Sequence, residues 1–290
     1  MGVKKVTFST SLSATTRMIK QANTSPEGLS IVPFSDGYDN GVVWGSDDIR
    51  DFLTSLISNG SQAMRGLITA KSNESRPITH VIYTPFMPFV SQVAYERGIS
   101  STLLWTQTAA VLDIYYCNFS GYSEKIEKIT SSEIVELPGL PLLKVCDLPS
   151  FLLDSCPDVN RIALEEMKVH FEPLEKEQNG KILVNTFDSL EYEALRALKK
   201  FKILAIGPLV PSAFLSGTHD SLDASFRGDM MMPMWKDYVK WLNSKDERSL
   251  VYVAFGSYSE LPIEQNRRDC KRVDTKWKAI LVGDKKTIKW

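Results

Sequence analysis

Three histidines are the side chains of this chain best suited to exchange a proton near neutral pH. His80 begins an apolar run, His170 lies in a segment of helical period, and His219 lies in a stretch rich in Pro, Ser and Gly. None of them stands in a recognisable catalytic motif, and we interpret each as structural or solvated. The sequence therefore indicates no general base by motif.

Carboxylates and one glycine-serine turn are the other candidates for chemistry. We interpret five carboxylates as charges on helix faces rather than as acid and base couples: Asp47, Asp48, Asp113, Glu165 and Glu166. Gly256 and Ser257 directly follow an apolar run at residues 250–255. At such a strand-to-loop turn, exposed backbone N–H groups can meet an anion.

The composition is that of an ordinary globular protein. The 290 residues hold 34 Lys or Arg and 35 Asp or Glu, a net charge of −1, and 43% are hydrophobic. This balance gives no overall cationic field for nucleic acid or anionic lipid. We find no apolar run of the roughly 18 residues that a membrane helix needs and no secretory signal, so we expect a cytoplasmic protein. The four irregularly spaced cysteines predict neither a metal site nor a disulfide framework.

The elements that must position these residues alternate along the chain. Short β-branched runs are separated by longer segments of helical period, which predicts an α/β fold with a parallel sheet. The expected strands, most of them apolar on both faces, are residues 6–10, 30–33, 80–83, 101–105, 182–185, 203–207 and 250–255. The expected helices begin at residues 49, 90, 108, 160, 191 and 235, and end at 57, 97, 119, 177, 200 and 243.

The composition changes twice in the second half of the chain. Residues 209–234 combine Pro, Ser, Gly, Asp and Met without clear period, which indicates an interdomain linker. We therefore assign residues 1–208 to a first Rossmann-like domain and 235–265 to the start of a second one. Residues 266–290 hold nine Lys or Arg and three Asp or Glu, a net of +6.

Seven segments resemble the plant family of UDP-dependent glycosyltransferases that modify small molecules, family 1 with the GT-B fold. They are VTFSTSLSATTRM near the start, HVIYTPFMPFVSQVA at 80–94, LLWTQTAAVLDIYY at 103–116, LPGLPLLKVCDLPSFLL at 137–153, ILVNTFDSLEYEALRAL at 182–198, AIGPLVPS at 205–212 and WLNSKDERSLVYVAFGS at 241–257. Their order is that of the family over residues 1–265. They are most similar to the branch that holds anthocyanin 5-O-glucosyltransferases and the crocetin and indole-acetate glucosyltransferases.

The resemblance implies two Rossmann-like domains that face each other across a cleft. The first would hold most of the acceptor and the second most of the UDP-sugar, with inverting transfer and no metal or cofactor. It also implies a histidine base supported by an aspartate. Residues 2–10 match the family's second strand, so we expect the first strand, its helix and that histidine to be absent. Thr84 stands where many members carry the aspartate, and a threonine cannot hold a full negative charge against an imidazolium.

Other positions of the resemblance form the wall of the cleft. It implies that Thr84, Phe86 and Tyr115 contact the acceptor. It likewise implies that Trp105 and Thr106 reach the donor sugar and that Ser257 lies near the donor phosphates. The alternative stays open at each position, because such aromatics are also ordinary core residues and such hydroxyls are ordinary helix caps.

The basic tail at residues 266–290 does not continue the resemblance. The family has an amphipathic helix and an apolar strand here, and this stretch shows neither period convincingly. Read one nucleotide later from Asn266, the codons can spell IEEIARGLIQSGRPFLWVI, which has both. We therefore interpret the tail as out of frame and without a selected function.

Three hypotheses for the function follow. The first is an enzyme that transfers glucose from UDP-glucose to a hydroxyl or carboxylate of a plant flavonoid, anthocyanin, phenolic or apocarotenoid-like molecule. The second is a catalytically inactive fragment, truncated at both ends, that is at most an acceptor-binding module. The third is a nucleic-acid binder that uses the basic tail. The first two imply a monomer whose partners are an acceptor and a UDP-sugar, without nucleic acid or membrane.

Overall fold

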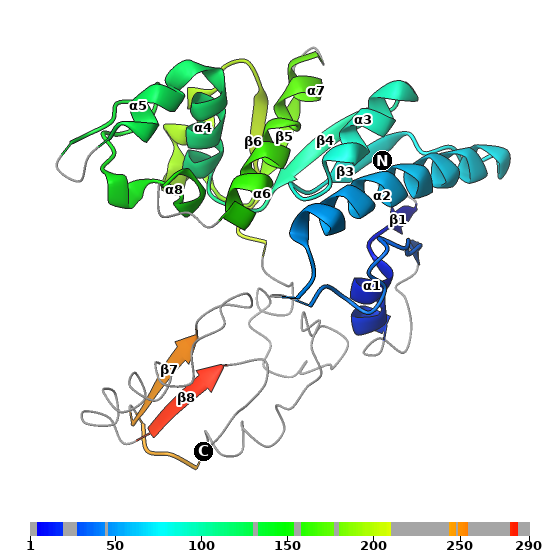
Figure 1. The fold of residues 1–290 in the computed structure, drawn as a ribbon, viewed down its shortest axis with the longest axis horizontal. Coiled ribbons are helices and arrows are strands. Elements are labelled where there is room, and N and C mark those ends of the chain that lie inside the picture. The colour runs from blue at the N-terminus through cyan, green and yellow to red at the C-terminus, as the bar shows by residue number, and fades with distance from the viewer. Residues whose placement is uncertain are drawn as a thin grey trace. The chain divides into compact units, whose positions relative to one another are not determined.

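The computed structural model divides the chain into two compact units, Met1–Met230 and Met231–Trp290. Figure 1 shows the helices and strands within them. The residues that the structure describes are 5–19, 28–43, 46–129, 133–153, 158–176, 180–209, 244–247, 249–254 and 279–283. No helix among these residues is both long and apolar enough to cross a membrane.

A four-stranded parallel sheet forms the centre of the first unit (Figure 1). Its strands, in order across the sheet, are β3 (His80–Tyr83), β4 (Ser100–Trp105), β5 (Lys181–Val184) and β6 (Lys202–Ala205). The register pairs Leu103 with Ile182 and Ile182 with Ile203. Because each strand is parallel to the one before it and all steps run in one direction, right-handed crossovers place the connecting helices on one face.

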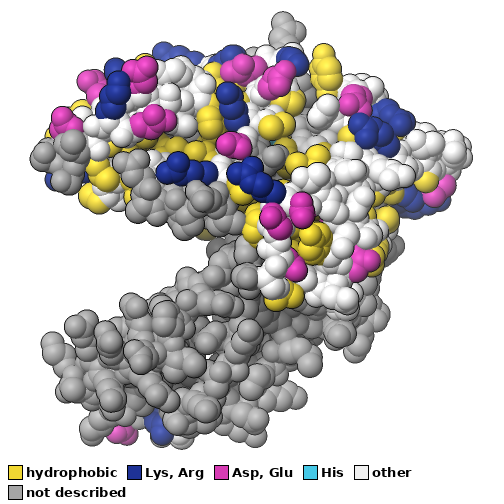
Figure 2. All heavy atoms as spheres, viewed as in Figure 1, with side chains coloured by type: hydrophobic (Ala, Val, Ile, Leu, Met, Phe, Trp, Pro, Cys, Tyr) yellow, Lys and Arg dark blue, Asp and Glu magenta, His cyan; other side chains and the backbone are white. Residues whose placement is uncertain are grey.

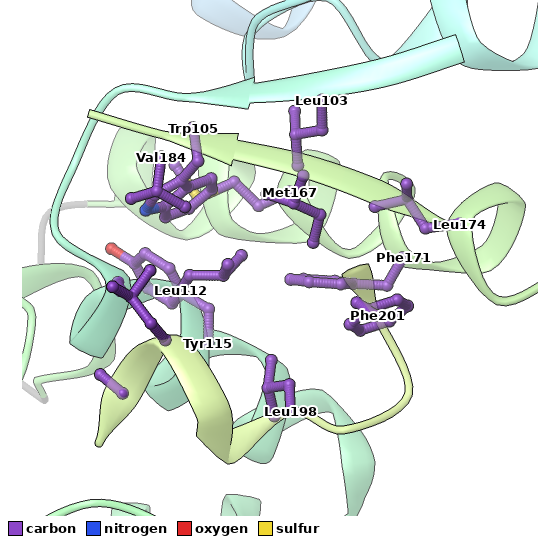
Figure 3. Close-up of a cluster of buried hydrophobic side chains, with 14 of the residues drawn as sticks. Leu103, Trp105, Leu112, Tyr115, Met167, Phe171, Leu174, Val184, Leu198 and Phe201 are labelled. Carbon is purple, nitrogen blue, oxygen red and sulfur yellow. The ribbon is translucent and has the colours of Figure 1, made fainter. Parts of the chain in front are cut away.

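The helices of these crossovers cover that face and form the main core with it. They are α3 (Pro88–Glu96), α4 (Ala109–Cys117), α6 (Asp158–Lys168), α7 (Phe171–Lys176), α8 (Asp188–Glu191) and α9 (Ala194–Ala197). Figure 3 shows Leu103 and Val184 of the sheet facing Leu112 of α4, Phe171 of α7 and Leu198 beside α9. Leu103, Val184 and Leu112 are fully buried. Each Å² of apolar surface that is removed from water stabilises the folded state by roughly 25 cal/mol. The burial of these side chains is therefore the main stabilising contribution to the unit.

The amino-terminal part of this unit adds a second, two-stranded parallel sheet and a long helix. The sheet pairs β1 (Val6–Phe8) with β2 (Leu29–Ile31), and α1 (Leu12–Ile19) connects them. The long helix α2 (Ile49–Asn73) begins at Asp48, whose side chain accepts hydrogen bonds from the backbone N–H of Arg50 and Asp51. It packs against α3 where Gly60 leaves room for the ring of Phe89.

A smaller core lies beyond the carboxyl end of α4. The chain continues there as a π-helical turn at Asn118–Tyr122 and as α5 (Ser123–Glu127). Gly121, at φ +102°, lies within this turn and allows the chain to kink there. The short 3-10 helices Val145–Asp147 and Ser150–Leu152 follow. The buried members of this core are Ile114, Cys117, Ile126, Val135, Leu137, Leu143 and Leu148.

The described part of the second unit centres on one strand pair. β7 (Leu250–Ala254) pairs in parallel with β8 (Ala279–Gly283), in a register that joins Leu250 to Ala279. No strand was predicted after residue 255, so β8 is an element that the sequence pattern did not indicate. Five small or apolar residues, AILVG, are enough for a strand once a parallel neighbour supplies the hydrogen bonds.

Most expected elements occur with small shifts of their ends, and the expected 80–83 strand is β3 without any shift. The helix expected over 160–177 is two helices, α6 and α7, because the chain turns at His170. Of the helix expected over 191–200, only Ala194–Ala197 form a helix, α9, because α8 ends at Glu191. The expected 235–243 helix and residues 210–234 of the expected linker lie outside the described residues.

Candidate ligand site at the carboxyl ends of β3 and β4

The hydroxyls of Thr84 and Thr106 follow two neighbouring strands of the parallel sheet. Thr84 comes directly after β3, and Thr106 comes directly after β4. The carboxyl ends of parallel strands meet at one edge of a sheet, which is where α/β folds bind ligands. Thr106 is exposed, Thr84 is half-buried, and Phe86 is 56% exposed. The structure thus places these three predicted residues on accessible turns at the same edge.

The turn between β4 and α4 is held from two sides. The Trp105 indole Nε1 donates a hydrogen bond to the carbonyl oxygen of Thr108, at 2.9 Å. The carboxylate of Glu191, in α8, accepts hydrogen bonds from the backbone N–H groups of Ala109 and Ala110, both at 3.0 Å. These N–H groups open α4 and have no partner within the helix, so an anion there also meets the positive end of the helix dipole. Thr106 therefore sits on a fixed turn.

Sequence reasoning missed Glu191. It lies in one of the segments that carry the family resemblance, yet its partners are 81 and 82 residues away along the chain. No spacing rule connects residues so far apart. Only the acidic character of the short α8 segment gave a signal, and that signal is shared by many surface helices.

Trp105 and Tyr115 lie inside the unit rather than on its surface. Their exposed fractions are 1% and 2%, and their rings meet edge to face with centroids 6.1 Å apart (Figure 3). Both belong to the core cluster with Leu112 and Val184. The described geometry therefore gives these side chains a packing role, and ligand contact by either of them stays a prediction.

His170 fixes the neighbouring turn after β3. It is almost fully buried, its ring stacks on Tyr83 with centroids 5.7 Å apart, and its Nε2 contacts the carbonyl oxygen of Pro85. Burial lowers the pKa of His170 to about 4, although the bond to Pro85 acts in the opposite direction. The ring is therefore neutral at pH 7, and its Nε2 acts as a donor that holds the backbone beside Phe86.

The other histidines and Ser257 do not join this site in the described structure. His80 lies at the amino end of β3, the opposite edge of the sheet from Thr84, and its Nε2 lies 2.8 Å from Thr102 Oγ1. His219 and Ser257 lie outside the described residues. The two described histidines, His80 and His170, therefore occupy structural positions.

A buried carboxyl lies one turn further along α4. Asp113 is fully buried, and neither of its oxygens has a hydrogen-bond partner among the described residues. Burial, together with the charge of Glu191, raises the pKa of Asp113 to about 8. The same environment raises the pKa of the Cys117 thiol to about 11. Asp113 is therefore a neutral acid at pH 7, and Cys117 is an unreactive thiol.

The described residues hold no metal cluster, and two hollows on their surface lie away from this edge. No group of three or more His, Cys, Asp or Glu side chains in the described ranges is placed to hold a metal ion. Two hollows, of about 570 and 360 Å³, are lined by residues around α5 and around α6 and α7, and neither includes Thr84, Phe86 or Thr106. On the face drawn in Figure 2, basic and acidic side chains of the described residues are interspersed.

Comparison with known proteins relates the chain as a whole to one group of enzymes. No profile of a known protein family matches the chain. UDP-glycosyltransferase 75C1 of Solanum lycopersicum is 44% identical over 277 residues, which cover 93% of this chain and 58% of that protein. Chloroplastic crocetin glucosyltransferase of Gardenia jasminoides is 42% identical over 267 residues, 91% of this chain and 56% of that protein. These relatives of the chain are plant UDP-glycosyltransferases.

The resemblance to plant UDP-glycosyltransferases inferred from the seven segments is thus confirmed, including the crocetin and anthocyanin branch. Anthocyanidin 3-O-glucoside 5-O-glucosyltransferase of Verbena hybrida is 42% identical over 259 residues. The chain spans only a little more than half the length of the curated relatives it matches.

Solved structures agree on the fold. The crystal structure of Os79 from O. sativa in complex with UDP has a TM-score of 0.71 and covers 97% of this chain and 61% of its own. UDP-glucose: anthocyanidin 3-O-glucosyltransferase in complex with UDP also has a TM-score of 0.71. At 20% identity these similarities bear on the fold alone, and they confirm the predicted α/β, GT-B-like class.

Proposed function

We propose that this chain is the acceptor-side part of a UDP-dependent glycosyltransferase. The reaction is the transfer of glucose from UDP-glucose to a hydroxyl or carboxylate of a plant flavonoid, anthocyanin, phenolic or apocarotenoid-like molecule. The observation that carries the proposal is the 44% identity over 277 residues to a plant UDP-glycosyltransferase. The names of other relatives, crocetin glucosyltransferase and phloretin 4'-O-glucosyltransferase, support the substrate class.

In this proposal the carboxyl edge of the sheet is the floor of the ligand site. Thr84 and Phe86 contact the acceptor, and the exposed Thr106 hydroxyl binds the donor sugar. Trp105 supports Thr106 through its bond to the Thr108 carbonyl, and Tyr115 supports Trp105 by ring contact. Ser257 keeps its predicted role near the donor phosphates. No metal or cofactor is needed, because UDP is a stable leaving group once its phosphates are bound.

The chemistry also needs a base. The acceptor oxygen attacks the anomeric carbon, the bond to UDP breaks with its electron pair on the phosphate oxygen, and the acceptor proton goes to the base. Thr84 cannot take or stabilise that proton as an aspartate–histidine pair would. Within the described residues, His80 is at the far edge and His170 is buried and neutral, so neither suits this role.

The second candidate is therefore a catalytically inactive chain that at most binds an acceptor. It is favoured by the same positions of His80 and His170. The division into an acceptor domain at 1–208, a linker at 209–234, the start of a donor domain at 235–265 and an out-of-frame tail at 266–290 is part of both candidates. So are a monomeric state, a cytoplasmic location and the lack of a nucleic-acid partner.

One experiment separates the two candidates. The purified chain is incubated with UDP-glucose and a panel of phenolic acceptors, and both product and acceptor binding are measured. Product supports the first candidate, whereas binding without product supports the second. Thr84→Ala should weaken acceptor binding, while Thr79→Ala, an exposed threonine before β3, should not. Absence of both product and binding contradicts the first candidate and removes the acceptor-binding role from the second.

A further inference from the structure

A hollow of about 360 Å³ lies between the carboxyl end of α4 and the helices α6 and α7. Thr84 and Thr106 do not line it, so it is separate from the candidate site at the edge of the sheet. Val169, one of its lining residues, is 40% exposed. Small-molecule sites commonly have volumes of roughly 300–1,000 Å³. The hollow is therefore large enough to hold a small ligand.

Three aromatic rings form one wall of this hollow. The ring of Phe171 contacts those of Tyr116 and Phe119, with centroids 5.3 and 5.8 Å apart. Phe171 is buried and anchors the wall in the core, whereas Tyr116 and Phe119 are half-buried and keep part of their surface accessible. The Tyr116 hydroxyl donates a hydrogen bond to Glu175 Oε1, at 3.0 Å, which fixes its ring. Such a wall offers a rigid apolar surface to the flat side of another ring.

Carboxylate oxygens provide the polar part of the hollow. Glu165, Glu172 and Glu175 line it, and all three are exposed. Lys176 holds Oε1 of Glu172, and Lys200 holds Oε1 of Glu175, each at 2.8 Å. The Oε2 atoms of these two glutamates and both oxygens of Glu165 form no hydrogen bond or ion pair with a described residue. An ionised carboxylate only accepts hydrogen bonds, so these oxygens call for a ligand that donates them.

The charges around the hollow favour a neutral donor. Lys168 lines the hollow, and Lys176 and Lys200 pair with two of its glutamates. Among the described side chains these three lysines balance the three glutamates, 3 minus 3, so neither an anion nor a cation is strongly attracted. A hydroxyl group suits the site better, because its O–H donates to a carboxylate in a charge-assisted bond. Its oxygen can also accept a bond from the Lys168 ammonium.

We propose that this hollow binds a neutral ring that carries several hydroxyl groups, either a sugar residue or a polyphenol. The flat side of the ring stacks on Tyr116 and Phe119. Its hydroxyls donate to Glu165 and to the Oε2 atoms of Glu172 and Glu175. Sugar residues and polyphenols share this chemistry, and the experiment separates them. The site is independent of the proposed glucosyl transfer, because it shares no residue with the edge of the sheet that holds Thr84 and Thr106.

The test uses the 290-residue chain with isotope-labelled valine methyl groups. The probes are methyl β-D-glucoside for the sugar and phloroglucinol for the polyphenol. Val169 lines the hollow, so its methyl signals in NMR spectra, assigned with Val169→Ala, report on this site. We expect one or both probes to shift these signals in a saturable way. Glu165→Ala, which removes an acceptor, and Phe119→Leu, which removes a ring, should each weaken that binding by about fivefold or more.

Two substitutions elsewhere are the matched controls. Glu127→Ala removes an exposed glutamate of α5, and Phe86→Leu changes an exposed phenylalanine at the edge of the sheet. Neither residue lines the hollow, so both variants should titrate the Val169 signals like the wild type. Circular dichroism checks that each variant folds, and Glu165→Ala decides the question if Phe119→Leu does not.

A response to the glucoside alone identifies a sugar residue as the ligand, and a response to phloroglucinol alone identifies a polyphenol. The proposal is overturned if neither probe shifts the Val169 signals, or if Glu165→Ala leaves the titration unchanged. Catalysis does not enter this measurement, so the proposal can fail while the proposed glucosyl transfer stands, and the reverse.

Discussion

Glu191 and Asp113 place two carboxyl groups on the first turns of α4. The Glu191 carboxylate accepts hydrogen bonds at the start of the helix, whereas the Asp113 carboxyl is buried one turn further along. Glu191 accepts hydrogen bonds from the backbone N–H groups that open α4, and its charge adds to the desolvation that raises the pKa of Asp113. One carboxylate thus satisfies the helix end while the other stays protonated one turn further along. Glu191 thus both holds the turn that carries Thr106 and affects how the stability of the fold depends on pH.

Asp113 should make the protein less stable as the pH rises towards 8. Its folded pKa of about 8 lies above its ordinary value of 3.8, so between these values the folded state holds a proton that the unfolded state has lost. The contribution to stability is then complete below pH 4 and falls by up to about 1.4 kcal/mol per pH unit until pH 8. Urea denaturation at pH 6.5, 7.25 and 8 measures the slope.

The matched pair for this prediction is Asp113→Asn and Asp51→Asn. The first keeps the shape of the side chain but removes the proton, so the slope between pH 6.5 and 8 should flatten. The second changes an exposed aspartate in the first turn of α2 and should leave the slope in place. An equal slope in wild type and Asp113→Asn would show that Asp113 is ionised in the folded state.

His170 should act in the opposite direction at lower pH. Its folded pKa of about 4 lies below its ordinary value of 6.5, so between these values the unfolded state binds a proton that the folded state does not. Stability from this residue therefore rises from pH 4 to 6.5 and is constant above. His170→Phe keeps a ring against Tyr83 and removes this rise, and loss of the bond to the Pro85 carbonyl costs about 1 kcal/mol. NMR titration of the His170 ring protons checks the pKa directly.

Removal of the Glu191 carboxylate should loosen the start of α4. In Glu191→Ala the N–H groups of Ala109 and Ala110 lose their partner, which costs about 1–3 kcal/mol where such groups are shielded from water. Urea denaturation gives that loss, and hydrogen exchange at the two amides should speed up. Glu193→Ala, an exposed glutamate two residues later, is the control and should change neither. Unchanged exchange at Ala109 and Ala110 in Glu191→Ala would refute the cap.

The two glycines of α2 should respond to alanine with opposite signs. A methyl group at Gly66 meets nothing within 4 Å, so Gly66→Ala should stabilise the helix by about 0.5–1 kcal/mol. A methyl group at Gly60 would overlap the ring of Phe89, so Gly60→Ala should destabilise by about 1–3 kcal/mol. Thermal unfolding of the two variants tests this, and equal shifts would mean that α2 does not pack on α3 through Gly60.

The local sequence pattern predicted most of the strands correctly, but it predicted fewer of the helices. The 80–83 strand was predicted with its observed bounds, because its apolar run is bounded by changes in period that need no distant partner. The break at His170 was not predicted, because the turn there coincides with the burial of the ring against Tyr83 and Pro85 of another element. β8 was missed for a similar reason, since its pairing partner β7 is distant in sequence.

The sequence by itself determined the α/β class, the resemblance to plant UDP-glycosyltransferases and the two threonines that directly follow β3 and β4. Those features follow from period, composition and motif, all of which are local. Only the tertiary structure decided that Glu191 caps a helix 82 residues away, that the oxygens of Asp113 find no hydrogen-bond partner among the described residues, and that Ile82 and Leu204 of the sheet are exposed. Burial and long-range hydrogen bonds depend on which elements meet, and no local pattern carries that information.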